Sequence, residues 1–273
     1  MKLSEYEVKA LEEIAKWEKT KYEGLHKRIL DMTSKPVDAI IKKVGKKRFS
    51  VFEKAIGRTV RRLLDASTHT IEPEELVKRA RSHGIMIKDI FEIRECDLEL
   101  IDKCNRKNIN FHEKAAAVQG AAAGLGGGLV ATADITAVLI QDFHMIQEIA
   151  FCHAYDPNTT AEKQIILHII EGALGGSEMK FEALEEIEAL ARVEDESDVD
   201  VTTRKGVPVL SAKALEDFIE HLASILIVRL VPRAIPILSM VVSAHSNHEI
   251  MEHSGNMAFM VYRKRFIERK RKL

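Results

Sequence analysis

The chain has 273 residues, of which 46% are hydrophobic and 30% charged, and its formal net charge at pH 7 is −1. This composition is typical of a folded globular protein and argues against global disorder. The balanced charge argues against a general nucleic-acid binder, and aromatic residues at 5% give no stacking platform for bases. Cys96, Cys104 and Cys152 form no C-x-x-C pair, and three is an odd number for a disulfide framework, so we expect a cytoplasmic protein. The charged N-terminus, without an apolar core, fits the same compartment.

Apolar residues recur at three- and four-residue steps along most of the chain, which predicts helices almost throughout. In the first third, we expect one long helix over Glu5 to Met32 that ends before Pro36. Two amphipathic helices follow, over Val37 to Val44 and over Phe49 to Leu64. Another begins at Pro73, a residue suited to a first helical turn, and stops near Gly84.

Two central helices are predicted next, one before and one after the glycines at 124–128. The turn that follows the second of them contains Thr159 and Thr160, either of which can cap the next helix. Arg192 to Ser211 is the longest stretch without a helical pattern. No series of alternating apolar and polar runs predicts a sheet, so we predict an all-α protein with a single domain over residues 1–273. The helices expected in this part are Asp97 to Ala123, Leu129 to Tyr155, Thr160 to Leu174, Glu178 to Ala191, Ala212 to Val231, and Ala234 to the terminus.

The segment from Ala115 to Ala133 carries no charge. A membrane-spanning helix needs roughly 20 predominantly apolar residues, but this segment contains only four large apolar side chains. It also fails the G-x-G-x-x-G phosphate-binding pattern, because Leu129 occupies the third glycine position. Small residues spaced four apart let neighbouring helices approach closely, and glycine also suits a turn between helices. We therefore predict either close helix packing or a helical hairpin at Gly120, Gly124 and Gly128.

The same segment continues into "AVQGAAAGLGGGLVATADITAVLIQDFHMIQEIAFCHAYD", which resembles the central signature of the EcsC family. The C-terminal "SAKALEDFIEHLASILIVRLVPRAIPILSMVVSAHSN" is similar to that family's proline-containing turn and its Ala-x-x-Asn step, here Ala244 and Asn247. Ala154 stands where family members tend to carry glycine. The resemblance implies a bacterial cytoplasmic or membrane-associated protein. The family's namesake is encoded beside the subunits of an ABC transporter linked to secretion.

Two groups of polar residues have a spacing that could bring metal ligands together. Asp134, Gln141, His144 and Glu148 fall within an arc of roughly 80° on one helix, and a second group on the last helix spans roughly 140°. The second group is not the H-E-x-x-H zinc motif, because its second histidine comes one residue late. Such groups are as typical of solvated or hydrogen-bonded faces as of metal sites. The candidate ligands of a divalent metal are His144, Glu148, His245, His248, Glu249, Glu252 and His253.

Basic residues gather in two regions, and each could attract an anionic lipid surface. A basic residue near such a surface contributes about 1 kcal/mol, although a solvated helix end has the same composition. The first region contains Lys42, Lys43, Lys46, Lys47, Arg48, Arg58, Arg61 and Arg62. The second, at the C-terminus, contains Arg263, Lys264, Arg265, Arg269, Lys270, Arg271 and Lys272.

These features together predict a non-catalytic protein that associates peripherally with the inner membrane face or with a membrane-protein partner, such as an ABC transporter or secretion component. Nucleic acid is not an expected partner. A metal-dependent helical-bundle enzyme, a hydrolase or an oxidoreductase, is the alternative. The sequence does not determine the oligomeric state, the substrate or the identity of a partner.

Overall fold

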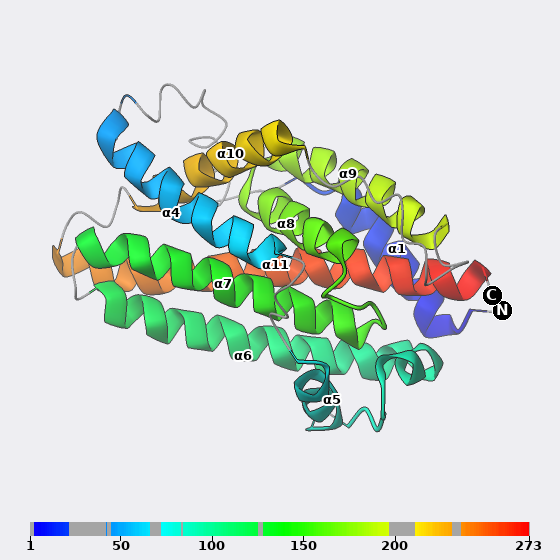
Figure 1. The fold of residues 1–273 in the computed structure, drawn as a ribbon. Coiled ribbons are helices and arrows are strands. Elements are labelled where there is room, and N and C mark those ends of the chain that lie inside the picture. The colour runs from blue at the N-terminus through cyan, green and yellow to red at the C-terminus, as the bar shows by residue number, and fades with distance from the viewer. Residues whose placement is uncertain are drawn as a thin grey trace.

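The computed structural model describes residues 3–21, 42, 45–65, 72–82, 84–124, 128–196, 211–230 and 236–272. Within these ranges the regular structure is helical and contains no strand, which confirms the all-α prediction. Figure 1 shows the helices lying side by side in a bundle. They are α1 (Glu5–Lys19), α4 (Lys46–Leu64), α5 (Pro73–Ser82), the 3-10 helix η1 (Ile90–Glu95), α6 (Leu98–Gly124), α7 (Gly128–Cys152), α8 (Thr160–Leu174), α9 (Ser177–Glu196), α10 (Ala212–Leu230) and α11 (Pro236–Lys272).

The longest helix, α11, runs through the middle of the bundle and packs against α1, α6, α7 and α8. It contributes to both clusters of buried apolar side chains. The larger cluster includes Ile250 and Tyr262 of α11 together with residues of α4, α7, α8 and α10. The smaller includes Phe266 and Ile267 with residues of α1, α5 and α6. Because α7 also contributes to both clusters, the two cores are continuous along α7 and α11.

The helix α8 is buried on nearly all sides, as expected for a helix at the centre of a bundle. Twelve of its fifteen residues are buried. Its start is fixed by Thr159, whose side chain accepts a hydrogen bond from the backbone N–H of Glu162. The sequence left the cap open between Thr159 and Thr160, and the structure places it at Thr159.

The glycine-rich segment separates two antiparallel central helices, because α6 ends at Gly124 and α7 begins at Gly128. Gly120 is buried on α6. The side-chain surroundings of Gly124 and Gly128 lie outside the described residues, so their role in close packing stays a prediction. Close approach of helices is evident at two other glycines. A Cβ atom on Gly255 of α11 would lie 2.9 Å from Cγ2 of Ile109, and one on Gly172 of α8 would lie 2.7 Å from Cβ of Ala183.

The prediction of one first helix as far as Met32 is wrong, since α1 ends at Lys19 with an extended C-cap at Thr20. The Lys180 ammonium from α9 donates hydrogen bonds to the carbonyl oxygens of Trp17 (2.5 Å) and Thr20 (3.1 Å). It therefore satisfies carbonyl groups that the end of the helix leaves without partners. The helix predicted over 37–44 and most of the segment 192–211 lie outside the described residues.

Two helices end in the same hydrogen-bonded motif but with different residues at its left-handed position. After α5, Gly84 has φ +91°, and the N–H of Ile85 donates to the carbonyl of Ala80. After α7, Ala154 has φ +62°, and the N–H of Tyr155 donates to the carbonyl of Ala150. This position favours glycine, because an L side chain is strained there. Ala154 is also one of the residues at which the sequence departs from the EcsC pattern.

Within the described residues, one window has the length and composition to cross a membrane, Ala133–Cys152 of α7. However, 72% of this window is buried inside the protein, against α4, α6, α8 and α11. The apolar character of α7 is therefore accounted for by its place in the core.

Candidate functional site

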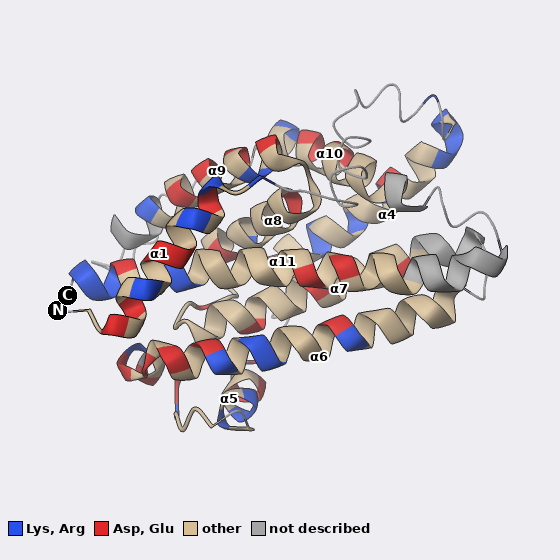
Figure 2. Ribbon diagram, turned by 180° about the vertical axis from the view of Figure 1, so that it is seen from behind, with Lys and Arg blue, Asp and Glu red and all other residues tan. Residues whose placement is uncertain are grey.

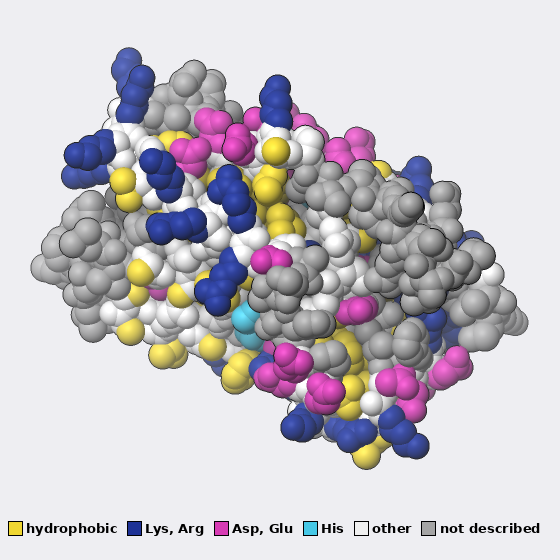
Figure 3. Space-filling model, viewed as in Figure 1, with side chains coloured by type: hydrophobic (Ala, Val, Ile, Leu, Met, Phe, Trp, Pro, Cys, Tyr) yellow, Lys and Arg dark blue, Asp and Glu magenta, His cyan; other side chains and the backbone are white. Residues whose placement is uncertain are grey.

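The outer face of α4 is strongly cationic. The helix carries seven basic residues and one acidic residue, Glu53, and all seven basic residues are exposed. Its opposite face, with Phe52, Ile56 and Val60, is buried in the larger core and fixes how the helix is turned. Figure 3 shows Lys and Arg side chains gathered over α4 on one side of the molecule. The exposed residues are Lys46, Lys47, Arg48, Lys54, Arg58, Arg61 and Arg62.

Few acidic groups in the described part of the chain neutralise this surface. Among the described residues, the carboxylate that pairs with an α4 cation is Glu216 of α10, 3.9 Å from Arg61, and both side chains are largely exposed. Three of the cations lie in the first turn of α4, which contains no acidic residue. The N-terminus of a helix carries partial positive charge, so cations there are unfavourable for the helix itself. Within the described residues, the α4 surface therefore carries positive charge that is not balanced by ion pairs and does not stabilise the helix.

The C-terminal basic region has the opposite environment, because its first residues point into the protein. Arg263 is 2% exposed and forms ion pairs with Asp102 (Nε to Oδ2, 2.8 Å) and Glu13 (Nη1 to Oε2, 2.6 Å). Arg265 is 7% exposed and pairs with Glu162 at 2.7 Å, in contact with the ring of Tyr155. The expectation that these residues present their charge to an anionic lipid surface is wrong for both arginines, because they are buried in ion pairs.

The next residues of this region mainly form ion pairs and hydrogen bonds with other parts of the protein. Lys264 lies 2.7 Å from Glu18 of α1 and 2.8 Å from Glu188 of α9. Lys270 lies 2.6 Å from Glu7 of α1, and Arg269 donates to the carbonyl of Ala154 at 3.0 Å. Figure 2 shows the acidic helix α1 lying beside the basic end of α11. Only the last two residues, Arg271 and Lys272, are exposed among these seven.

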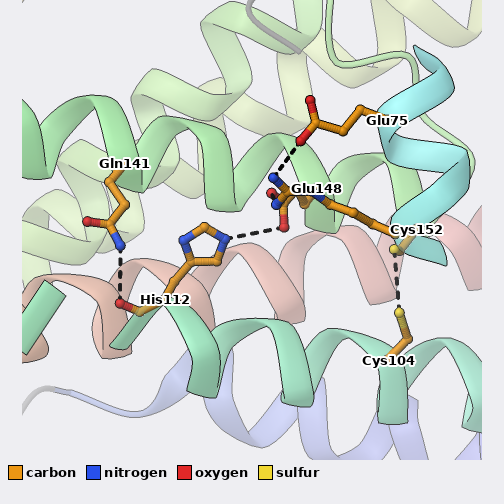
Figure 4. A network of polar contacts seen from close by, with 7 residues as sticks. Glu75, Cys104, His112, Gln141, Glu148 and Cys152 are labelled. Carbon is orange, nitrogen blue, oxygen red and sulfur yellow. Dashed lines mark hydrogen bonds and ion pairs between the residues drawn. The ribbon is translucent and has the colours of Figure 1, made fainter. Parts of the chain in front are cut away.

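The first candidate metal group is occupied by protein partners. Glu148 accepts a hydrogen bond from Nε2 of His112 at 3.2 Å and forms an ion pair with Arg79 of α5 (Figure 4). Arg79 in turn pairs with Glu75 at 2.7 Å. Burial raises the pKa of Glu148, but His112 and Arg79 outweigh this and leave it lowered. Burial lowers the pKa of His144, which lies beside this network.

The second candidate group lies along α11 and is only partly buried. His245 is 3.4 Å from Glu249, and His248 and Glu252 lie near Glu113 of α6, whose pKa they influence. His253 is half-buried. Within the described residues, no three His, Cys, Asp or Glu side chains are arranged to hold a metal ion. The two groups therefore do not come together to form the metal site that their spacing suggested. Glu148 instead contacts Arg79 of α5 and His112 of α6.

A different contact joins α7 to α11. Asn247 donates from Nδ2 to both carboxylate oxygens of Asp134, at 3.2 Å each, and Gln119 of α6 donates to Oδ1 at 3.3 Å. Asp134 and Asn247 belong to the two separate stretches in which the sequence resembles the EcsC family. Both are buried, so this contact joins the C-terminal part of α6 to the N-terminal parts of α7 and α11.

Sequence reasoning missed two members of the buried polar interior. His112 is 36 residues from Glu148, and Cys104 is 48 residues from Cys152, so no local spacing connects the partners. The two thiol sulfurs lie 3.8 Å apart. A weak signal was present, since Cys104 and His112 fall on one side of the predicted helix over 97–123, two helical turns apart.

Comparison with known proteins identifies the family of the chain. The profile of the EcsC protein family matches residues 8–267. The chain belongs to the EcsC family. An uncharacterized protein of Bacillus subtilis (strain 168), YdbA, is 28% identical over 179 residues, which is 59% of each chain. The chain thus spans about three fifths of this relative's length. No solved structure matches the chain.

Proposed function

We propose that this EcsC-family protein is a non-catalytic, peripheral membrane protein that binds anionic lipid through the exposed cationic face of α4. The observation that carries the proposal is that all seven basic residues of α4 are exposed, with Glu216 as their partner among the described residues. At about 1 kcal/mol per basic residue near an anionic surface, several such residues suffice for reversible attachment. The resemblance to a family with a transporter-linked namesake supports a place at the cytoplasmic face.

Apolar residues near the cations favour a lipid surface over a purely ionic partner. Val51 lies on α4 among the basic residues and is 63% exposed. Phe111 and Val118 of α6 are 64% and 72% exposed, and Figure 3 shows apolar side chains over α6 and α7 on the same side of the molecule as α4. Apolar side chains beside basic residues let an interfacial helix enter the headgroup region.

Co-sedimentation with lipid vesicles tests the proposal. The full chain is mixed with vesicles of phosphatidylcholine alone or of phosphatidylcholine with phosphatidylglycerol, in a series of salt concentrations. We expect sedimentation only with the anionic vesicles. It should weaken as the salt rises, because the Debye length falls from about 10 Å at 0.1 M to about 3 Å at 1 M.

Three other results would reject this function. Equal sedimentation with both kinds of vesicle would show that the α4 charges are not the basis of binding. Absence of sedimentation at low salt would leave a membrane protein, rather than lipid, as the membrane partner to test. Salt-sensitive binding to a DNA fragment, without vesicle binding, would assign the cationic surface to nucleic acid.

A further inference from the structure

Two buried thiols face each other between α6 and α7, outside the surface proposed to bind lipid. Sγ of Cys104 lies 3.8 Å from Sγ of Cys152, and the two residues are 3% and 6% exposed. Figure 4 shows that the two sulfur atoms point directly toward each other. A disulfide bond is about 2.05 Å long, so the sulfur atoms need to approach by roughly 1.8 Å to form one.

Both thiols line a small cavity between α5, α6 and α7. It offers about 10 Å³ to the centre of a water-sized molecule, which is about the space of one water. Such a space suits an oxidant scarcely larger than water and excludes a peptide disulfide. The side chains that line it are Leu76, Arg79, Ala80, Cys104, Asn108, Glu148, Phe151 and Cys152.

We propose that Cys104 and Cys152 are a redox-active dithiol, which hydrogen peroxide oxidises to a disulfide between α6 and α7. The Cys104 thiolate attacks one peroxide oxygen, so that an S–O bond forms and the O–O bond breaks. The hydroxide that leaves takes up the proton released by Cys104. The sulfur of Cys152 then attacks the Cys104 sulfenic acid, and the second oxygen leaves as water with the Cys152 proton. Two thiols lose two electrons, and one peroxide becomes two waters.

The surroundings assign different roles to the two sulfur atoms. The hydrogen bond between the thiols lowers the pKa of Cys104 and raises that of Cys152, and burial raises the latter further. Lys107, one turn after Cys104, also lowers the pKa of Cys104. A thiolate is the nucleophile in such reactions, so Cys104 attacks first and Cys152 resolves the sulfenic acid.

Cys96 provides a control within the same chain. It lies before α6, is only partly buried, and has no cysteine partner among the described residues. Burial and the nearby acidic side chains Asp97, Glu92 and Glu95 raise the pKa of the Cys96 thiol. Cys96 is therefore more accessible than either thiol of the pair, but its thiol is less easily ionised than that of Cys104. We expect it to stay reduced at a peroxide concentration that oxidises Cys104 and Cys152.

Mass mapping of the folded protein tests the proposal. The full chain is treated with one equivalent of hydrogen peroxide, alkylated in denaturant and digested without reductant. We expect a linked peptide pair that contains Cys104 and Cys152, lighter by two hydrogens, restored by dithiothreitol, while Cys96 is alkylated. Cys152→Ser should stop at a Cys104 sulfenic acid, which dimedone traps. Cys104→Ser should yield no sulfenic acid at Cys152, and Cys96→Ser should form the same disulfide as the unsubstituted protein.

Other outcomes would overturn the proposal. If Cys104 and Cys152 remain fully alkylated after peroxide treatment, the pair is not redox-active. If the disulfides formed contain Cys96, the thiols react by exposure and not through the cavity. If glutathione disulfide gives a mixed disulfide at Cys104 as fast as peroxide reacts, the cavity does not select the oxidant by size. The mapping of the unsubstituted protein decides the matter even if a serine variant fails to fold.

Discussion

The chain carries two basic helical segments that look alike in sequence but have opposite environments. On α4, all the cations are exposed, and three of them stand in the first turn, where the helix dipole is unfavourable to them. On α11, the cations come in the last turns, where the dipole favours them, and Arg263 and Arg265 are buried in ion pairs. Most of the α11 cations therefore have a structural role, whereas those of α4 are exposed and are the ones proposed to meet an anionic partner.

The difference shows that the number of basic residues in a segment does not indicate what they bind. In α11 the cations alternate with Tyr262, Phe266 and Ile267, which belong to the core, so part of the basic set must turn inward with them. In α4 the buried apolar residues and the basic residues occupy separate faces of the helix. Burial of a charge is costly unless a partner is present, and α1, α6 and α8 supply those partners to α11.

The largest expected effect comes from removing a buried partner of α11. Glu162 is fully buried and accepts hydrogen bonds from Arg265 (2.7 and 3.0 Å) and from Tyr262 (2.7 Å). Glu162→Gln leaves the buried guanidinium of Arg265 without a counter-charge, so we expect the free energy of unfolding to fall by about 3–5 kcal/mol. Urea unfolding followed by circular dichroism measures this change.

The matched control is the same substitution at the partner of an α4 cation. Glu216 pairs with Arg61 at 3.9 Å, with both side chains largely exposed. Glu216→Gln should change the free energy of unfolding by no more than about 0.5 kcal/mol. Equal losses for the two variants would contradict the distinction drawn between the segments.

For lipid binding we expect the opposite: substitutions on α4 should have a large effect and substitutions on α11 a small one. Lys54 and Arg58 lie one turn apart on the exposed face of α4. Removing two cations costs about 2 kcal/mol, and the added repulsion raises this further, so Lys54→Glu with Arg58→Glu should weaken binding to anionic vesicles at least about thirtyfold. Vesicle co-sedimentation across a series of lipid concentrations measures the change.

The same double reversal on α11 serves as the comparison for lipid binding. Arg271 and Lys272 are exposed at the end of α11, which lies at the other end of the molecule from the start of α4 (Figure 1). Arg271→Glu with Lys272→Glu should leave vesicle affinity within about twofold, because salt screens exposed charges that lie more than a Debye length apart. A loss as large as that of the α4 variant would place the C-terminal region at the membrane after all.

The burial of His153 beside the cations of α11 predicts that the stability of the protein depends on pH. His153 is fully buried, stacks on Tyr262, and lies 2.8 Å from the carbonyl of Ile149. Burial lowers its pKa to about 4, and Arg263 and Arg265 lower it as well. Between about pH 6.5 and pH 4 the unfolded chain therefore binds a proton that the folded protein does not. Stability from this residue is complete above pH 6.5 and is lost as the pH falls.

A drop from pH 7 to pH 5 should lower the free energy of unfolding by about 2 kcal/mol through His153 alone. His153→Gln, which does not titrate, isolates this contribution from that of the carboxylates. The difference in unfolding free energy between the two pH values should be smaller in the variant by that amount. An identical pH dependence in both proteins would show that His153 is protonated in the folded state.

Local signals in the sequence were sufficient for most of the helices. The apolar periodicity, Pro73, Gly84 and the Thr159 cap placed α4 to α8 close to where the structure has them. The end of α1 could not be predicted, because it depends on Lys180, which lies 160 residues from Thr20. The inward turn of Arg263 and Arg265 depends in the same way on Asp102 and Glu162. Contacts between distant residues decide these features, and one sequence does not display them.

The candidate site was predicted only in part, for a similar reason. Six of the seven basic residues of α4 were recognised by composition, and Lys54 was not. Their exposure follows from the buried apolar face that includes Phe52 and Ile56. The metal hypothesis rested on spacing within single helices, which does not reveal that Glu148 is engaged by Arg79 and His112. Spacing along one helix fixes the face on which a residue lies but not the element that meets that face.

The smallest expected effect concerns the turn that accepts the side chain of Arg269. Ala154 holds φ +62° at the end of α7, where Gly84 holds φ +91° at the end of α5. A left-handed conformation costs an L residue about 1–2 kcal/mol, and glycine loses part of this gain through its freer unfolded chain. Ala154→Gly should therefore raise the free energy of unfolding by up to about 1 kcal/mol, measured by urea unfolding. Ala137→Gly, at an exposed position within α7, should lower it by a similar amount, because glycine is unfavourable inside a helix. If both variants lose stability equally, glycine does not relieve the left-handed strain at Ala154. The hydrogen bond from Arg269 to the carbonyl of Ala154 would then have to depend on the alanine methyl group.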